Sequence, residues 1–161
     1  MAASVPSSTA EAFPGPSDAS IPALLRGARG SYAGTIDRLL AEAGCDDLPR
    51  NGPFVLGGMA SHGASAVAMI RGLGVTRQAA SQLIDSLVVR GYLSRDVNPA
   101  DRRRLNIGLT ERGRAAAEAI ASAIARVDDE LAAMITPAEL AGLRAGLIAL
   151  AAIRGRTMHD G

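Results

Sequence analysis

Short polar and basic side chains between residues 76 and 104 have the types and spacing that suit recognition of DNA. Thr76 to Arg90 has helical periodicity, because an apolar set recurs every three or four residues: Ala80, Leu83, Ile84, Leu87 and Val88. Amides and hydroxyls can hydrogen-bond to base edges, and guanidinium groups can pair with phosphates. We therefore expect DNA contacts from this helix and the segment after it, at Thr76, Arg77, Gln78, Ser81, Gln82, Arg95, Arg102, Arg103 and Arg104.

A basic hairpin is predicted directly after this helix. Tyr92 to Asp96 is a short strand candidate, and residues 105–109 alternate apolar and polar or small side chains, as a half-buried strand does. Between them lie Asn98-Pro99, which favours a turn, and an arginine-rich tip. Arg95 and Arg90 are expected to touch the DNA backbone or to brace the hairpin. An amphipathic helix alone usually reflects packing, and an arginine cluster alone is usually a solvated surface. A helix, a hairpin and a basic tip in this order, however, are the layout of a winged helix-turn-helix.

These residues resemble the MarR family of transcription regulators. The match is close over residues 74–113. The matching segments are Gly74 to Ala79, Leu83 to Leu87, Arg90 to Leu93, Arg95, Pro99 to Arg103 and Leu109 to Gly113. The resemblance implies a homodimeric regulator that binds an operator in double-stranded DNA. We expect an inverted-repeat operator, a cytoplasmic location and repression, while the sequence leaves activation open. The resemblance also implies that Arg103 at the wing tip reaches the minor groove. A small aromatic or phenolic effector would release the DNA.

The composition limits the alternatives. The 161 residues suit one compact subunit, and 48% are hydrophobic, but only 2% are aromatic and Trp is absent. Alanine and leucine must therefore form most of the core, which favours close helix contacts completed by a partner subunit. The net charge is only +1, although all 17 basic residues are Arg, so any positive surface must be local. No segment predicts a secretory signal or a membrane span.

Helices are expected on both sides of the DNA-reading segment. Residues 1–20 predict an unpacked tail, and Ile21 to Ala43 predicts a helix that its glycines weaken. The glycines indicate either a break near Gly30, which we favour, or a close approach to another helix. Gly52-Pro53 starts a second helix, which ends at Gly63 and has core candidates Phe54, Val55, Leu56 and Met59. Ser65 to Arg71 predicts a short helix with Val67, Met69 and Ile70 as core, followed by the helix-turn-helix turn at Gly74.

Two further helices follow the hairpin. Thr110 is expected to cap a helix that reaches Met134, and Thr136 and Glu139 form a capping box before a helix from Pro137 to about Arg154. The predicted fold class is mainly α with a small β-hairpin wing. A winged helix-turn-helix head, residues 51–113, joins a helical dimerisation domain from both termini, residues 21–50 and 114–156. The alternative is that the terminal helices pack back on their own head as a monomer.

Other functional candidates have weaker support. Arg26, Tyr32 and Phe54 are candidate effector ligands, although ordinary packing is the competing explanation for each. Cys45 is the only cysteine, which fits a reducing compartment, and a redox role is the less favoured interpretation. His62 and His159 lack the spacing of metal ligands.

The sequence favours a regulator over two competing classes. No nucleophile with a base and no cofactor loop is present, so neither an enzyme nor a cofactor is predicted. The remaining alternative is a winged helix that serves protein interaction or dimerisation without binding DNA.

Overall fold

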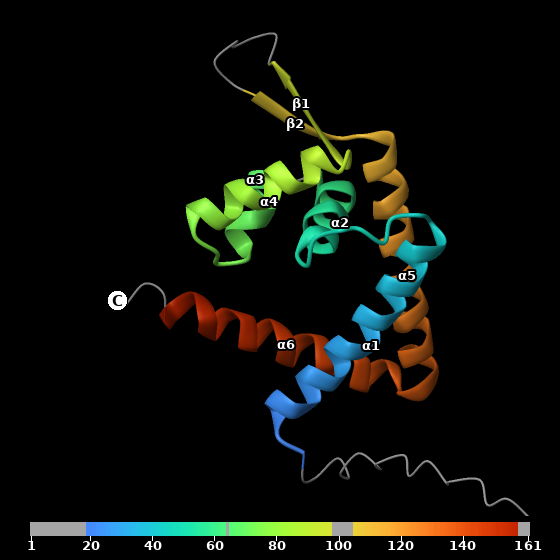
Figure 1. The fold of residues 1–161 in the computed structure, drawn as a ribbon. Helices are drawn as coiled ribbons and strands as arrows, with labels where there is room; N and C mark the ends of the chain where they lie inside the picture. Colours follow the sequence, from blue (N-terminus) through green and yellow to red (C-terminus); the bar gives the residue numbers. More distant parts are fainter. Residues whose placement is uncertain (1–18, 64, 98–104, 158–161) are drawn as a thin grey trace, which may run out of the picture.

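The computed structural model describes residues 19–63, 65–97 and 105–157, which form helices and one antiparallel hairpin. The elements are α1 (Ile21–Glu42), α2 (Gly52–His62), α3 (Ala66–Gly72), α4 (Arg77–Val89), β1 (Leu93–Val97), β2 (Leu105–Leu109), α5 (Glu111–Met134) and α6 (Pro137–Thr157). Figure 1 shows α2, α3, α4 and the hairpin as a head beside the long helices α1 and α5, with α6 extending under the head. The predicted fold class, mainly helical with a hairpin wing, is confirmed.

Several helices begin at capping residues, and the sequence predicted those before the last two helices. The hydroxyl oxygens of Ser65, Thr76 and Thr110 accept hydrogen bonds from backbone N–H groups three residues later. Such caps satisfy donors that the first helical turn cannot pair internally. Thr136 and Glu139 form the predicted capping box, in which the Glu139 carboxylate accepts from the backbone N–H of Thr136 at 2.8 Å. Side chains therefore determine most helix starts locally.

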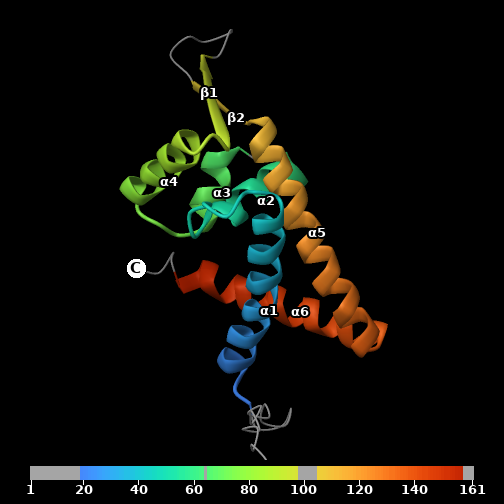
Figure 2. The same cartoon turned by 45° about the vertical axis from the view of Figure 1, so that its right-hand side comes forward.

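Helix α1 runs without interruption, so the predicted break near Gly30 is wrong. A Cβ added at Gly30 or Gly34 would meet nothing within 4 Å, so neither glycine marks a close helix contact within this chain. The helix instead gains support from α5, against which it packs (Figure 2). Tyr32 of α1 donates its hydroxyl hydrogen to Asp128 of α5, with 2.5 Å between the oxygens. Tertiary contacts thus compensate for the low helix propensity of glycine.

The core lies where the head meets the first half of α5. Its largest buried side chains are Tyr92, Leu56, Ile70, Leu87, Leu93 and Ile120. Two predicted core residues are wrong, since Phe54 is 48% exposed and Val67 is 45% exposed. Helix α2 directs Val55 and Leu56 inward instead, and α3 directs Ala66 and Ile70 inward. Both helices are apolar on most sides, so periodicity alone could not identify their buried face.

Helices α2 and α3 approach closely at Gly58. A Cβ at this position would lie 1.9 Å from Cε and 2.5 Å from Sδ of Met69. The bare backbone of Gly58 therefore makes room for the methionine side chain, which fills the space between the two helices. This contact gives a physical reason for one of the two adjacent glycines in α2.

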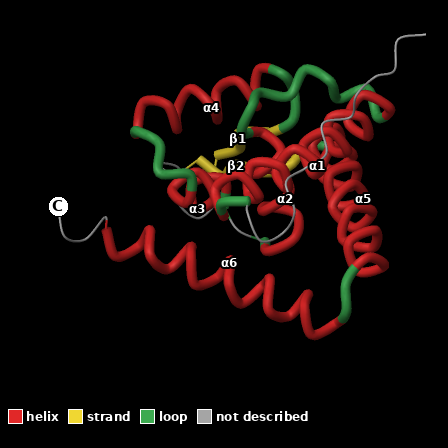
Figure 3. The backbone as a smooth tube through the Cα atoms, turned by 90° about the horizontal axis from the view of Figure 1, so that it is seen from below, coloured by secondary structure: helices red, strands yellow, loops and turns green. Residues whose placement is uncertain are grey.

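Burial decreases along α1 and α5 with distance from the head, and α6 is exposed along most of its length. The buried residues of α5 end at Ala123, while Met134 at its other end is exposed. In α6, all residues from Ala141 to Ile153 are exposed, including Leu143, Leu147 and Leu150. Figure 3 shows α6 along the edge of the molecule, connected to α5 by a short loop. Among the described residues, no helix is apolar over enough length to cross a membrane.

We predict that Gly113→Ala destabilises the protein by about 2 kcal/mol or more, because overpacking a buried site forces its surroundings to shift. A Cβ at Gly113 would lie 2.1 Å from the backbone oxygen of Tyr92, which cannot move freely. The matched control is Gly57→Ala, whose Cβ would make an ordinary 3.4 Å contact with Ile120. Urea unfolding should show a large decrease in the free energy of unfolding for Gly113→Ala. For Gly57→Ala it should show a small decrease or a small increase. Equal midpoints would contradict this explanation of Gly113.

Candidate nucleic-acid interface

Helix α4 presents one face to the head and the opposite face to solvent. Ile84 and Leu87 are buried, and Ala80, Leu83 and Val88 pack partly buried against the same core. The positive φ of Gly74, 66°, shapes the turn before the helix, and that of Gly91, 75°, ends it. The packing of α4 on the core leaves one polar surface of this helix exposed. It is formed by Arg77, Gln78, Ser81, Gln82 and Asp85. Amides, a hydroxyl and a guanidinium on an exposed helix have the chemistry to contact bases and phosphates.

Thr76 begins this helix and has a structural role as well as a predicted binding role. Its Oγ1 accepts from the N–H of Ala79 at 3.2 Å. A hydroxyl that accepts one hydrogen bond retains its own hydrogen for donation. The side chain is exposed, so the same group can cap the helix and donate to a phosphate.

Arg95 on the wing forms an ion pair with Asp85 on α4. Asp85 places a negative charge on the exposed face of α4, and Arg95 supplies the charge that balances it. The pair also connects the first strand of the wing to the solvent-facing side of α4. Arg95 therefore has a bracing role, one of the two roles expected for it, and its positive charge is partly balanced within the head.

The wing is a regular antiparallel hairpin with Leu93 opposite Leu109 and Val97 opposite Leu105. Leu93 is buried, whereas Ile107 and Leu109 pack partly buried against the core. The predicted DNA contacts Arg102, Arg103 and Arg104, with Asp101 beside them, lie outside the described residues. The strands that precede and follow these arginines project away from the body of the molecule beside α4 (Figure 1).

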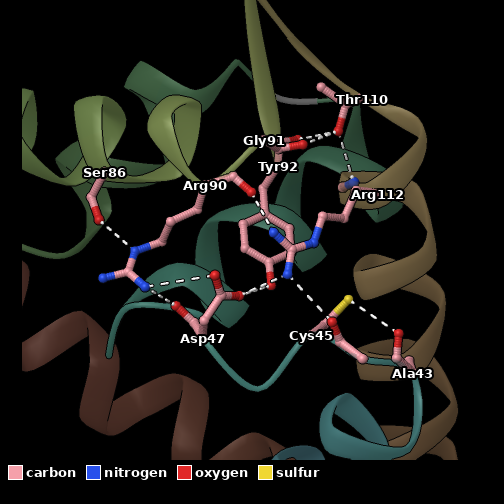
Figure 4. Close-up of polar contacts among 11 residues, drawn as sticks. Ala43, Cys45, Asp47, Ser86, Arg90, Gly91, Tyr92, Thr110 and Arg112 are labelled. Carbon is pink, nitrogen blue, oxygen red and sulfur yellow. Dashed lines mark hydrogen bonds and ion pairs between the residues drawn. The ribbon is translucent and has the colours of Figure 1, made fainter.

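A cluster around Asp47 joins the end of α4, the start of the wing and the start of α5, and the sequence analysis missed it. Figure 4 shows the Asp47 carboxylate between Arg90, Tyr92 and Arg112. The Tyr92 hydroxyl donates to Asp47, Arg112 Nη2 lies 3.0 Å from Asp47 Oδ1, and Arg90 Nη1 lies 3.7 Å from Asp47 Oδ2. Arg90, Tyr92 and Arg112 occur in the family-like pattern, but their partner lies in a loop more than forty residues earlier. No local sequence signal could have paired them.

The cluster shifts the titration of its members. The hydrogen bond from Tyr92, with the charges of Arg112 and Arg90, lowers the pKa of Asp47. Burial, followed by the hydrogen bond to Asp47, raises the pKa of Tyr92 well above its usual range. At neutral pH the phenol is protonated, as in any tyrosine, and it donates to an ionised carboxylate, which is the stronger kind of hydrogen bond.

The three candidate effector ligands do not lie together. Tyr32 lines an apolar hollow of about 460 Å³ between the first half of α1, the end of α5 and α6. Phe54 lines a separate cavity of about 220 Å³ between α2, α3 and α5, beside Met69 and Ile124. Arg26 is exposed and lines neither of these two spaces. The hydrogen bond to Asp128 raises the pKa of Tyr32, so its hydroxyl also stays protonated at neutral pH.

Comparison with known proteins agrees with this geometry. A model of the MarR family matches residues 46–104, from the loop before α2 to the connection between the wing strands. The fold is the winged helix-turn-helix that solved MarR-type structures share, and residues 46–104 are similar to the MarR family. This family comprises DNA-binding transcription regulators rather than enzymes, in agreement with the exposed face of α4. No curated protein sequence matched the chain.

Solved structures of MarR-type proteins share the fold over most of their length. The chain resembles S. aureus MepR in a MepR–DNA complex, with 23% identity over 81% of this chain and 94% of that one, and a TM-score of 0.64. It also resembles RV1404 from Mycobacterium tuberculosis, with 25% identity over 83% and 90% of the two chains and a TM-score of 0.61. S. aureus MepR bound to ethidium bromide gives 23% identity, coverage of 83% and 96%, and a TM-score of 0.54.

The lowered pKa of Asp47 predicts a contribution to stability that depends on pH. This contribution is complete above the ordinary carboxyl value of 3.8 and is lost as the pH falls through the lower value in the folded protein. Asp47→Asn should therefore unfold at a lower temperature than the parent at pH 7, and the difference should shrink as the pH approaches 3. Thermal unfolding at a series of pH values measures this.

The control for this experiment is Asp46→Asn, which removes a neighbouring exposed carboxylate outside the cluster. For this control, the difference in unfolding temperature between pH 7 and pH 3 should be close to that of the parent. If Asp47→Asn and the parent lost stability in parallel on acidification, the ionised carboxylate would have no special role.

Proposed function

We propose that the protein is a homodimeric, sequence-specific DNA-binding transcription regulator, a repressor that occupies an inverted-repeat operator. The observation that carries the proposal is the division of α4 into a buried apolar face and an exposed polar face beside the wing. The family match and the fold shared with MepR in a MepR–DNA complex support it. The cytoplasm, where DNA is accessible and a lone cysteine stays reduced, is the proposed location.

Each residue of α4 has a role suited to its position. Thr76, Arg77 and Gln78 lie at the first turn, where the helix would enter the major groove. Ser81 and Gln82 follow one turn later, and a glutamine amide can pair with adenine through two hydrogen bonds. Arg77 can instead hold a phosphate. Outside α4, Arg103 at the wing tip is assigned to the minor groove, flanked by Arg102 and Arg104.

A dimer is needed to place two such helices on one side of the duplex. In a twofold dimer they would enter successive major grooves roughly 34 Å apart, so the operator should be an inverted repeat. The exposed leucines at the start of α1 and along α6 support this arrangement, because a monomer rarely leaves so much apolar surface in water. The hollow of about 460 Å³ between these helices would receive apolar side chains of the partner.

A small aromatic or phenolic effector is proposed to release the DNA from the cavity that Phe54 lines. This cavity lies between the head and α5, so an occupant would alter the angle between them and hence the spacing of the two recognition helices. MepR has been solved with bound ethidium, an aromatic molecule. Tyr32 is assigned to the dimer contact rather than to the effector, because its hollow opens beside the exposed leucines.

We predict that Arg103→Ala weakens operator binding about tenfold or more, because it removes a groove contact at the wing tip. The assay is a titration at fixed salt with duplex DNA from the region upstream of the protein's own coding sequence, after footprinting locates the operator. The control, Arg126→Ala, removes an exposed arginine of α5 outside the head. Affinity that falls steeply with added salt would be expected throughout.

The same titration separates the alternative function. A winged helix that binds only proteins would tolerate loss of Arg103 and show no preference for the upstream DNA. If the parent protein protects no sequence there and binds DNA only weakly at all salt concentrations, the proposed regulator function is wrong.

Leu147→Glu is predicted to convert the dimer to a monomer. Leu147 lies on the exposed side of α6 that lines the apolar hollow, and a carboxylate there would have to be buried without a partner. Light scattering after size exclusion measures the mass, and operator affinity should fall with it. Ala145→Glu, on the opposite side of the same helix, is the control and should remain dimeric. A dimeric Leu147→Glu protein would argue against this interface.

A further inference from the structure

The Asp47 carboxylate connects parts of the chain that the proposed function uses separately. Asp47 lies in the loop after α1, Arg90 caps the end of α4, Tyr92 precedes the wing, and Arg112 lies in the first turn of α5. The side chains of the last three converge on Asp47 (Figure 4). Arg90 Nη1 also donates to the backbone oxygen of Asp47 at 2.7 Å. Asp47 therefore holds the C-terminal end of α4 and the start of the wing against the loop that follows α1.

The turn between α4 and the wing is held from its other side by α5. Arg112 stacks over the Tyr92 ring, 4.4 Å from its centroid, and donates to the backbone oxygen of Arg90 at 2.5 Å. Thr110 Oγ1 donates to the backbone oxygen of Gly91 at 2.6 Å and lies 3.1 Å from that of Tyr92. The three successive carbonyls of Arg90, Gly91 and Tyr92 thus accept from the segment that starts α5, and that of Tyr92 accepts from the backbone N–H of Thr110 at 3.1 Å.

These contacts fix the orientation of the wing relative to α4 more than they stabilise the folded protein. The Asp47, Arg90 and Arg112 side chains are 39–42% exposed, and exposed ion pairs contribute little to folding. Several bonds to backbone carbonyls, however, limit the rotations available to the turn. Gly91 has a φ of 75°, and glycine is the residue with the greatest conformational freedom, so this turn would be the natural hinge between helix and wing.

We infer that Asp47 is a positioning residue that, through Arg90, Tyr92 and Arg112, locks the recognition helix and the wing into one rigid reading unit. This inference rests on the proposed function. In a rigid unit, insertion of the helix brings the wing to its groove without further ordering of the chain, so the two contacts reinforce each other. Without Asp47 the hinge at Gly91 becomes freer, and the wing must be ordered when the DNA binds.

The test is a double-mutant cycle between Asp47→Asn and Arg103→Ala, measured as operator affinity in the full-length dimer. Asp47→Asn should weaken binding about fivefold to tenfold while the dimer mass and the circular dichroism spectrum stay unchanged. Arg103→Ala should cost at least about tenfold in the parent but less than about threefold in the Asp47→Asn background. Such a loss of coupling would not follow from reduced stability alone, because it concerns the wing contact specifically.

Two controls keep the outcomes distinct. Gln82→Ala, a change in the helix itself, should cost the same in both backgrounds, because Asp47 acts on the wing's attachment. Tyr92→Phe keeps the ring under Arg112 but removes one donor to Asp47, and it should reduce the coupling partially. It also replaces Asp47→Asn in the cycle if that variant unfolds at the assay temperature.

The inference is overturned if Arg103→Ala costs the same with and without Asp47, or if Asp47→Asn and Tyr92→Phe bind like the parent. A different result, in which the parent itself binds no upstream DNA, overturns the proposed function and the inference with it.

Discussion

The hydrogen bond from the buried Tyr92 to Asp47 is the contact around which the head is arranged. The chain has only two tyrosines, two phenylalanines and no tryptophan, and Tyr92 is the largest side chain wholly inside. Its ring fills the core, its hydroxyl reaches Asp47, and its backbone oxygen accepts from Thr110. That same oxygen leaves no space for a Cβ at Gly113. Features that look independent in the sequence therefore meet at one residue. Its buried phenol needs a partner for the hydroxyl, and its backbone oxygen excludes a Cβ at position 113.

A chain so poor in aromatic residues has difficulty covering its own apolar surface. Alanine and glycine allow α2, α3 and the first half of α5 to approach closely, as at Gly58, and this part of the molecule is well packed. The same small residues give α6 little to bury against α1, and a hollow remains between them. The molecule thus has a well-packed part, where the head meets the first half of α5, and a distal end whose apolar residues remain exposed. A second copy would supply the missing apolar contacts, as the Ala- and Leu-rich composition leads one to expect.

The parts of the fold that depend on neighbouring residues were predictable from the sequence. Capping side chains at Thr76, Thr110 and Thr136 marked the helix starts, and alternation marked the strand at 105–109. The orientation of α2 and α3 was not predictable, because helices that are apolar on most sides have no polar face to exclude from the core. The partners of Arg90 and Arg112 were not predictable either, since a salt bridge across more than forty residues leaves no periodic pattern. The pairing of Arg95 with Asp85 joins a strand to a helix across ten residues, and a carboxylate on a face that would meet DNA requires such neutralisation.

That neutralisation has a consequence for how the proposed reading surface would work. With Asp85 paired to Arg95, the exposed face of α4 carries Arg77 as its remaining charged group beside neutral amides and a hydroxyl. Such a face offers base contacts but little general attraction to phosphates, so a single head would discriminate sequences while binding weakly. Under the proposed function, affinity would then come from Arg102, Arg103 and Arg104 and from the linkage of two heads. In a dimer the second head binds at an effective concentration set by the first, which raises affinity without new contacts. The rigidity of each head and the incomplete distal surface are thus complementary requirements, because linked heads gain from one another only if both hold a fixed geometry.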